Sequence, residues 1–368
     1  FNFGANWKGW DFSCILCLRF ETPFQGKDGL DQRQAVLEKI GVEVTEDFDY
    51  AIGDCDAILL EVNDPALHWE YFSRCAKLGK PVFLDKPFAD TLENMNKIID
   101  LASKEGVRYF TASSLRYDLD MAEALSSGIK AESATIWGPV GKAASGSSLI
   151  WYGVHTFEML ERIMGLGAEK VFVSPDSRGY VCHVVYKDGR RGVVDLTYNA
   201  YRYGGVIRDN ASAECMFQST GRIPFYHLLL LEIREFFLGR SNGVDLRESM
   251  EIMAMLVAAE RSLASNSWEP VLSLDLCNSE IRRINFRDKS LESQITREYA
   301  EIKQNDRELT LSKAYYGNGH PRQLANFISA IRGEEELGVP VHSAAHAVDI
   351  VLSVYESYNT GKRITLTF

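Results

Sequence analysis

The chain has 368 residues, enough for two domains, and its 46% of hydrophobic and 25% of charged residues are typical of a globular protein. A net charge of −11 argues against a nucleic acid as the main partner, because binding phosphates requires a basic face. No apolar run approaches the roughly 20 residues of a membrane span, and seven scattered cysteines fit reduced thiols in a cytoplasmic protein better than a disulfide framework.

The first third of the chain predicts strands that alternate with helices. The run DAILLEV at 56–62 is apolar without alternation, which is typical of a strand covered on both faces. After it, Asp64 is expected to cap a helix that Pro65 begins and Gly79 ends. This order is typical of βαβ units and predicts a parallel, Rossmann-like sheet. The predicted strands are 12–20, 56–62, 81–84 and 107–111, and the predicted helices are 29–40, 65–78 and 90–105.

Polar side chains follow three consecutive strands of this predicted sheet. A parallel sheet binds ligands outside the carboxyl ends of its strands, so we expect these side chains to meet at one edge. A single polar strand end would mean little, whereas three that converge indicate a site. The residues concerned are Asn63, Asp64, Asp85, Lys86, Ser113, Ser114 and Arg116.

The pattern changes after about residue 118. Residues 156–165 predict a helix, and residues 179–197 alternate apolar and polar side chains around Asp188-Gly189, which is typical of an antiparallel hairpin. The expected fold class is therefore α/β, with a Rossmann-like parallel sheet domain followed by an α+β domain whose sheet is largely antiparallel.

An internal similarity links two later stretches of the chain. Residues 233–262 and 328–357 align without gaps at an offset of 95, and each predicts a helix, a loop and a second amphipathic helix. Few residues are identical, so both a duplication and a chance similarity remain open.

Two motifs now suggest a family. The stretch 56–87 ends in Asp85-Lys86-Pro87 and resembles the Rossmann domain of the glucose–fructose oxidoreductase, inositol dehydrogenase and rhizopine-catabolism (Gfo/Idh/MocA) family, in which a strand, a helix and a Gly-Lys-x-Val run lead to Glu-Lys-Pro. Residues 151–160, WYGVHTFEML, resemble the second motif of that family, Gly-x-His followed by an acid three residues later. The resemblance covers about residues 12–271.

The resemblance implies reversible hydride transfer between NAD or NADP and a carbon that bears a hydroxyl, on a sugar, cyclitol or related polyol. Lys86 is expected to polarise that hydroxyl and His155 to take its proton. The locked φ angle of Pro87 is expected to fix the direction of the chain, and Asp85 to orient Lys86 or to bind the backbone. The small-molecule substrate is expected beside Arg116, Tyr152 and Glu158, and no metal is required.

The expected organisation also follows from the resemblance. Residues 1–118 are expected to form the dinucleotide-binding domain, 119–275 the substrate and oligomerisation domain of a homo-oligomer, and 276–368 an extension that repeats the helical ending of the family. Glu21 is expected to meet the adenosine ribose, although Arg19 and Lys27 are near enough to suggest a 2′-phosphate, so NAD versus NADP stays open.

Two further cofactor contacts are predicted. Asn63 lies at a strand end on the expected cofactor edge. His68 could touch the cofactor from the first turn of its helix, or it could be a surface histidine.

The sequence departs from the family at two points. Where the family often carries an aspartate, four residues before the histidine, this chain has Trp151. Either His155 works alone, Tyr152 or Glu158 helps it, or the usual dehydrogenation is not performed. Residues 1–11 supply no first strand and no glycine-rich turn, so either these parts are missing from the sequence or no dinucleotide is bound.

Two other classes of function therefore stay open. The first is a non-catalytic ligand-binding or regulatory protein on the same fold. The second is an enzyme that retains its cofactor and performs an epimerisation or an elimination.

Two patterns that look like metal sites carry little weight. Cys14 and Cys17 lie three apart on a predicted strand and so face opposite sides of it. His342 and His346 lie four apart but lack the glutamate of the zinc-protease motif. We therefore expect no metal.

Overall fold

A computed structural model describes residues 14–199 and 202–272, and beyond them 326, 329–330, 332–334, 336, 338–339, 341–362 and 364–366. Contacts within the chain divide it into two compact units, Phe1–Arg287 and Asp288–Phe368. None of the described helices is both long and apolar enough to span a bilayer.

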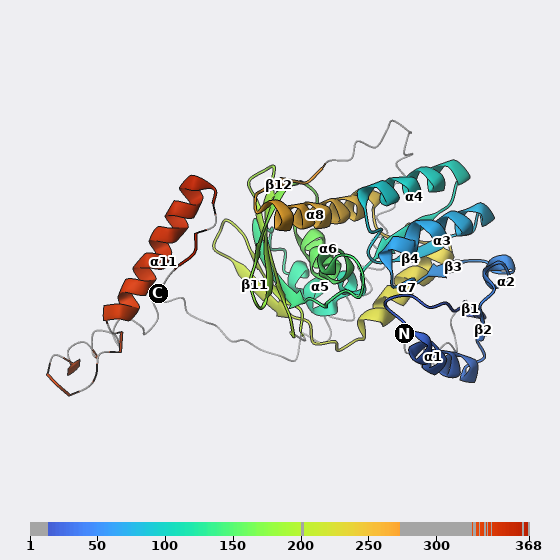
Figure 1. Cartoon of the computed structure of the whole chain (residues 1–368), viewed down its shortest axis with the longest axis horizontal. Coiled ribbons are helices and arrows are strands. Elements are labelled where there is room, and N and C mark those ends of the chain that lie inside the picture. The colour runs from blue at the N-terminus through green and yellow to red at the C-terminus, as the bar shows by residue number, and fades with distance from the viewer. Residues whose placement is uncertain are drawn as a thin grey trace. The chain divides into compact units, whose positions relative to one another are not determined.

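The first unit begins with two pieces of parallel sheet (Figure 1). Strands β1 (Leu16–Leu18) and β2 (Glu43–Thr45) pair with each other in parallel. Strands β3 (Ile58–Leu60), β4 (Val82–Asp85) and β5 (Tyr109–Ala112) form a second parallel sheet in that order. Parallel pairing is confirmed, whereas the predicted lack of a first strand stays a prediction, because residues 1–13 lie outside the described part.

Helical segments follow these strands as the alternation predicts. They are α1 (Lys27–Lys39), α2 (Phe48–Gly53), the 3₁₀ turn η1 (Pro65–Leu67), α3 (His68–Cys75), the 3₁₀ turn η2 (Ala76–Leu78) and α4 (Leu92–Glu105).

Capping explains where the helical segment after β3 begins and ends. The Asp64 carboxylate accepts the backbone N–H of Ala66 at 3.1 Å, and Pro65 opens the segment. Gly79 ends it with a φ of 64°, a left-handed conformation that glycine adopts without strain. The predicted cap, start and stop are all confirmed.

A helix from the second half of the chain covers one face of the three-stranded sheet. Helix α7 (Phe225–Phe237) packs there against Phe83 and Phe110, and the rings of Phe110 and Phe236 lie 4.8 Å apart. The chain therefore returns to its first sheet after completing the second. The predicted boundary at residue 118 is not a packing boundary, because the first unit runs through it.

The second sheet of this unit has seven strands in the order β11-β10-β6-β9-β8-β7-β12. Only β6 and β9 pair in parallel, so the sheet is largely antiparallel as predicted. The predicted hairpin is β8–β9, and Gly189 turns it with a φ of 88°. The strands are β6 (Ser133–Pro139), β7 (Ala168–Pro175), β8 (Gly179–Tyr186), β9 (Arg191–Thr197), β10 (Gly204–Arg208), β11 (Glu214–Gln218) and β12 (Glu269–Pro270).

Helices α6 (Val154–Met164) and α8 (Leu246–Ser265) cover the inner face of this sheet (Figure 1). The packing is close, because a Cβ added to Gly192 on β9 would lie 2.9 Å from the side chain of Leu160 on α6. One continuous hydrophobic core joins Phe72 of the first part to Leu256 on α8. Each large aliphatic or aromatic side chain buried in this core contributes about 1.5–3 kcal/mol.

Two short elements connect the two sheets, the 3₁₀ turn η3 (Ser114–Tyr117) and α5 (Leu119–Ser126). The π-helix η4 (Leu149–Gly153) follows β6 and runs directly into α6.

The second unit contains helix α11 (Val341–Thr360). Its bounds lie at an offset of 95 from those of α8, the offset at which the two stretches of sequence align. Both helices end in the same way. Ser262 Oγ donates to the carbonyl of Ser267 at 2.7 Å, and Ser357 Oγ donates to the carbonyl of Lys362 at 2.7 Å. The sequence similarity therefore extends to the geometry of the helix end.

Candidate active site

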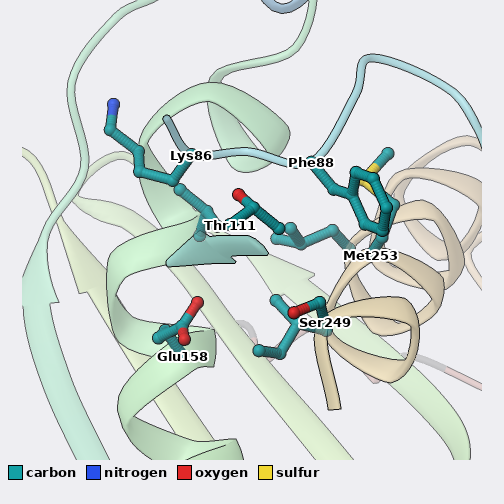
Figure 2. Close-up of a pocket in the computed structure, with 9 residues that line it drawn as sticks. Lys86, Phe88, Thr111, Glu158, Ser249 and Met253 are labelled. Atoms are coloured by element: carbon teal, nitrogen blue, oxygen red, sulfur yellow. The ribbon is translucent and has the colours of Figure 1, made fainter. Parts of the chain in front are cut away.

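Lys86 lies at the carboxyl end of β4, directly after a buried strand. The Lys86–Pro87 peptide is cis, and Pro87 is buried. The Asp85 carboxyl accepts the backbone N–H of Lys86. Of the two roles predicted for Asp85, the structure therefore shows binding to the backbone. Burial raises the pKa of Asp85, and the Lys86 ammonium opposes that shift. Figure 2 shows the Lys86 amine extending away from the pocket beneath it, and within the described residues it has no hydrogen bond or ion pair.

His155 begins helix α6 and is buried beside the end of β5. Its Nδ1 lies 2.7 Å from the hydroxyl oxygen of Ser113, which also accepts the backbone N–H of Leu115 at 3.1 Å. Burial, and then the charge of Lys86, lower the pKa of His155 well below its usual range. The imidazole is therefore neutral at pH 7, and it lies close enough to Lys86 to sense that charge.

Three tyrosines surround this pair. The ring of Tyr152 meets the imidazole of His155 edge-on at 5.0 Å, and that of Tyr203 lies 6.2 Å away. The Tyr203 hydroxyl is hydrogen-bonded to Tyr152. Tyr226 is hydrogen-bonded to Ser114, and burial and then Asp85 raise its pKa to about 12. These rings, of which the sequence singled out only Tyr152, give the region one aromatic wall.

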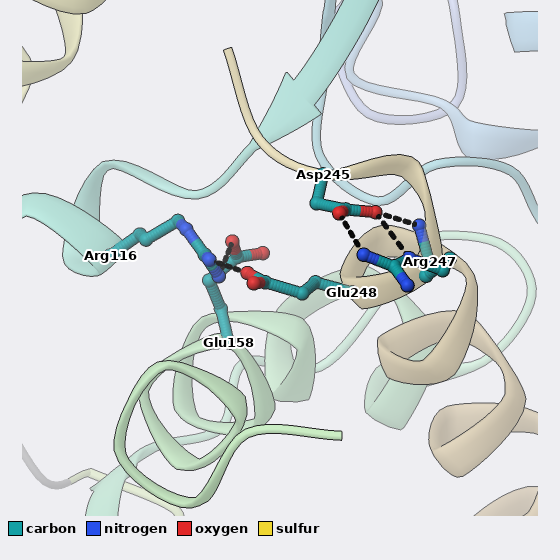
Figure 3. Close-up of polar contacts among 5 residues, drawn as sticks. All are labelled: Arg116, Glu158, Asp245, Arg247 and Glu248. Carbon is teal, nitrogen blue, oxygen red and sulfur yellow. Dashed lines mark hydrogen bonds and ion pairs between the residues drawn. The ribbon is translucent and has the colours of Figure 1, made fainter. Parts of the chain in front are cut away.

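Arg116 and Glu158 face each other rather than an open site (Figure 3). The guanidinium of Arg116 contacts a Glu158 carboxylate oxygen at 3.2 Å and also pairs with Glu248 on α8. Both Arg116 and Glu158 are buried. This placement argues against the substrate contacts predicted for them, because their charged atoms already satisfy one another. In the same view Asp245 caps α8 and pairs with Arg247 at its exposed edge.

A small cavity lies below Lys86, between β5, α6 and α8 (Figure 2). Its volume is about 10 Å³, room for about one water molecule and far too little for a sugar or a nicotinamide. The buried hydroxyl of Thr111 lines it and has no hydrogen-bond partner within the described part of the chain. The cavity is therefore not the substrate site. Its lining residues are Lys86, Phe88, Thr111, Val154, Glu158, Ser249, Ile252, Met253 and Leu256.

His68 joins two strand ends beneath the cofactor edge. It is fully buried, its Nε2 lies 2.7 Å from the carbonyl of Val62, and its Nδ1 lies 3.4 Å from the carbonyl of Phe88. Both ring nitrogens thus face backbone, so the side chain is neither a surface histidine nor free to contact a cofactor.

Asn63 is held by the residue that replaces the family acid. Its Oδ1 accepts the indole N–H of Trp151 at 3.1 Å, and the Trp151 ring lies 5.1 Å from that of Phe24. The indole therefore ties the loop after β3 to the π-helix before His155, instead of acting on His155.

Glu21 is exposed three residues after β1, as a ribose contact requires. Nearby, Arg19 is already paired with Asp31 at 2.8 Å and with Glu46 at 3.7 Å. Its charge is therefore engaged within the protein, whereas Lys27 at the start of α1 is exposed.

One further acid lies at this edge and is not among the predicted site residues. Glu61 follows β3, and burial and then Asp85 raise its pKa to about 8. The signal was present, because a carboxylate inside the apolar run 56–62 is unusual in a buried strand. Tyr226, by contrast, opens α7 more than 100 residues further on, and no local pattern marks it.

No group of three or more His, Cys, Asp or Glu side chains that could hold a metal gathers in the residues that the structure describes. Cys14 and Cys17 are free thiols, and burial raises the pKa of Cys17 to about 11. The side chains of His342 and His346 lie outside the described part.

The geometry thus places a lysine at the carboxyl edge of a parallel sheet, near a buried, neutral histidine from a helix that covers the largely antiparallel sheet. Residues 27–113 match the model of the Gfo/Idh/MocA oxidoreductase family, described as an NAD-binding Rossmann fold. The family resemblance, the fold class and the cofactor class, NAD or NADP, are thereby confirmed.

The chain also resembles curated proteins in sequence and solved structures in fold. The chain is 27% identical over 228 residues to myo-inositol 2-dehydrogenase of Thermotoga maritima, covering 52% of this chain and 64% of that protein. It is 42% identical over 66 residues to inositol 2-dehydrogenase of Klebsiella pneumoniae, covering 18% and 19%. The WlbA dehydrogenase of Bordetella pertussis, solved with NADH and UDP-GlcNAcA, shares the fold with a TM-score of 0.54 at 17% identity, covering 71% and 90%. The chain thus spans less than two thirds of the curated relatives that it matches.

Proposed function

We propose that this protein is an NAD(P)-dependent oxidoreductase that transfers a hydride between nicotinamide and a hydroxyl-bearing carbon of a sugar, cyclitol or related polyol. The observation that carries the proposal is that the Lys86 amine, which has no hydrogen-bond or ion-pair partner within the described residues, lies near a neutral, buried His155 at the carboxyl edge of the parallel sheet. The family match over residues 27–113 and the inositol dehydrogenase relatives support it.

The residues present fit a nicotinamide dinucleotide at this edge. The Lys86 amine has no partner within the described residues, and the exposed Glu21 carboxylate is available to ribose hydroxyls. Because Arg19 is engaged by Asp31 and Glu46, we propose NAD rather than NADP as the preferred cofactor. The bound nicotinamide would supply the hydride acceptor, and no metal is needed.

The protein's own groups would prepare the substrate hydroxyl. The Lys86 ammonium donates a hydrogen bond to the hydroxyl oxygen and stabilises negative charge on it as the C–O double bond forms. His155 accepts the hydroxyl proton, for which a neutral imidazole is required. The tyrosine rings beside His155 would pack against the carbon face of a ring-shaped polyol.

Cofactor binding is the first test. Calorimetric titration of the full chain with NADH, NAD⁺ and NADPH should show binding, tightest for NADH and NAD⁺, which lack the 2′-phosphate. Glu21→Ala should weaken NADH by about tenfold, since it removes one charge-assisted hydrogen bond. If none of the three binds, the oxidoreductase proposal is wrong and a non-catalytic ligand-binding role gains support.

Activity is the second test, with myo-inositol and related polyols as substrates and NADH absorbance as the readout. Lys86→Ala should lower kcat/KM by about 100-fold or more, because it removes the group that stabilises the developing charge. Lys77→Ala is the matched control, because Lys77 is exposed in the preceding turn and should retain activity. Cofactor binding without net absorbance change, together with substrate isomerisation, would instead identify a cofactor-retaining enzyme.

We also propose that the protein is a homo-oligomer through the outer face of its seven-stranded sheet. Side chains of β8 alternate between the covered inner face and this outer face, where they are only half-buried, as an interface requires. Light scattering on the full chain would contradict this by returning the mass of one chain.

A further inference from the structure

We propose that Ser113 is the positioning residue of His155: its hydroxyl oxygen accepts Nδ1–H and leaves Nε2 bare to take the substrate proton. This inference rests on the function proposed above. It starts from the 2.7 Å contact between Ser113 Oγ and His155 Nδ1, which joins the end of β5 to the start of α6. Both side chains are buried, with Ser113 at 0% and His155 at 6% exposure.

The position of Ser113 is fixed by the surrounding polar groups. Its backbone N–H donates to the Glu158 carboxylate, and its hydroxyl accepts the N–H of Leu115 at 3.1 Å. Glu158 is in turn held by Arg116, which also pairs with Glu248 on α8. Residues of η3, α6 and α8 therefore fix Ser113 in place, and Ser113 in turn contacts His155. Arg116 and Glu158 are thus positioning residues for His155.

Hydrogen-bond capacity permits the tautomer of His155 that the proposed reaction needs. A hydroxyl oxygen has two acceptor lone pairs, so Ser113 can accept both Leu115 N–H and His155 Nδ1–H. With its proton on Nδ1, the neutral imidazole has a free lone pair on Nε2 and can act as a base. With the proton on Nε2, the ring could not accept a second proton there.

The same hydrogen bond serves both states of the reaction. In the oxidation direction the substrate O–H bond would break and its proton would go to Nε2 of His155, while a bound nicotinamide would supply the acceptor for the hydride, with its two electrons, from the carbon. A carbonyl forms, and the resulting imidazolium still donates Nδ1–H to Ser113. No group has to rotate between the two states, which keeps the ring in place.

A hydroxyl partner also explains how the site works with Trp151 in place of an acid. The Trp151 indole is committed to Asn63, so it is not the partner of His155. The charged and titratable groups around the imidazole are Lys86 from the end of β4, Tyr152 from η4 and Tyr203 from the segment before β10. A neutral serine is compatible with that nearby Lys86 charge and leaves the histidine uncharged.

The direct test is the tautomer of His155, read by two-bond ¹H–¹⁵N correlation spectra of the full ¹⁵N-labelled chain. The chain has seven histidines, and His155→Asn assigns the signal by its disappearance. We expect a protonated Nδ1 and a bare Nε2. Ser113→Ala should mix the two tautomers, and Ser113→Thr, which keeps the hydroxyl, should restore the original one. A wild-type ring protonated mainly on Nε2, or a spectrum unchanged in Ser113→Ala, would overturn the proposal.

Kinetics give the second readout where the wild type shows activity. Ser113→Ala should lower kcat by about tenfold with KM changed less than about twofold, since the ring loses its orientation rather than a substrate contact. Ser113→Thr should recover most of kcat, and equal rates for wild type and Ser113→Ala would count against the proposal. A protein that shows no oxidoreductase activity still gives the tautomer result, so failure of the proposed function and failure of this inference are distinguishable.

Discussion

Helices α8 and α11 have the same length and corresponding sequences, yet their side chains lie in opposite surroundings. Met255, Leu256 and Ala259 on α8 are fully buried against α6 and the seven-stranded sheet. Their counterparts on α11, at an offset of 95, are Ile350, Val351 and Val354, which are 47%, 54% and 63% exposed. Equivalent apolar positions therefore have a cover in one unit and lie open in the other.

This difference separates two kinds of information in the sequence. The apolar spacing and the serine at the helix end suffice to specify a helix of the same length in both places. They do not specify which surface covers it, because that depends on residues far away in the chain. Burial, and hence stabilisation at about 25 cal/mol per Å² of apolar surface, belongs to the surroundings.

The largest expected effect comes from a charge placed at equivalent positions of the two helices. Leu256→Asp should destabilise the first unit by more than about 4 kcal/mol, because it puts an unpaired carboxylate in the core. Val351→Asp should change the unfolding of that unit by less than about 0.5 kcal/mol, because Val351 is exposed. Urea unfolding followed by tryptophan fluorescence measures both.

A loss of stability in Val351→Asp as large as that in Leu256→Asp would contradict the contrast between the two helices. It would show that α11 is covered in solution as α8 is. The wild-type chain and the conservative variant Val351→Ala serve as references for the helix itself.

The site shows the same division between local pattern and distant partner. Lys86 is a candidate from the sequence alone because a buried strand, a polar pair and a proline stand next to each other. The contact of Ser113 with His155 spans 42 residues and forms only when α6 packs beside the end of β5. The sequence shows that Ser113 is a polar residue at a strand end. It does not show which side chain contacts Ser113, because that depends on how α6 packs.

Arg116 shows what a prediction from local sequence leaves out. It follows β5 at the expected edge, and a local reading gives it to the substrate. In the folded protein Glu248, 132 residues further on, and Glu158 take both ends of its guanidinium. A paired arginine and a free one have the same local sequence, so only the three-dimensional arrangement distinguishes them.

The fold shows a similar limit at α7. Its helical pattern belongs to the second half of the chain, yet Ile233 and Phe236 cover the first sheet. A boundary drawn where the pattern changes, at residue 118, therefore separates residues that share one unit.

Helix α6, which packs against α8, also contains a buried acid, and this acid should make the stability of the first unit depend on pH. Glu161 on α6 is 1% exposed, and both its carboxyl oxygens lack a hydrogen bond within the described residues. Burial, and then Glu251 on α8, raise its pKa from 4.5 to about 8. The folded state thus holds the proton more tightly than the unfolded chain, so stability should fall as the pH rises from about 4.5 to 8 and level off above that.

Glu161→Gln removes this titration. We expect the variant to be more stable than the wild type by about 2–4 kcal/mol at pH 8.5 and nearly equal to it at pH 4.5. Urea unfolding at the two pH values gives the difference, and a gain of equal size at both would exclude titration of Glu161 as its source.

The smallest expected difference compares the two helix ends. Ser262 is fully buried, and besides donating to Ser267 its hydroxyl accepts the backbone N–H of Val173 on β7 at 2.9 Å. Ser262→Ala would leave that N–H buried without a partner, at a cost of about 1–2 kcal/mol. Ser357→Ala on α11 loses only the bond to Lys362 at the surface, which we expect to cost about 0.5 kcal/mol or less. Helix content by circular dichroism and urea midpoints measure the pair, and equal costs would mean that the capping bond, rather than the sheet beneath α8, determines what the serine contributes.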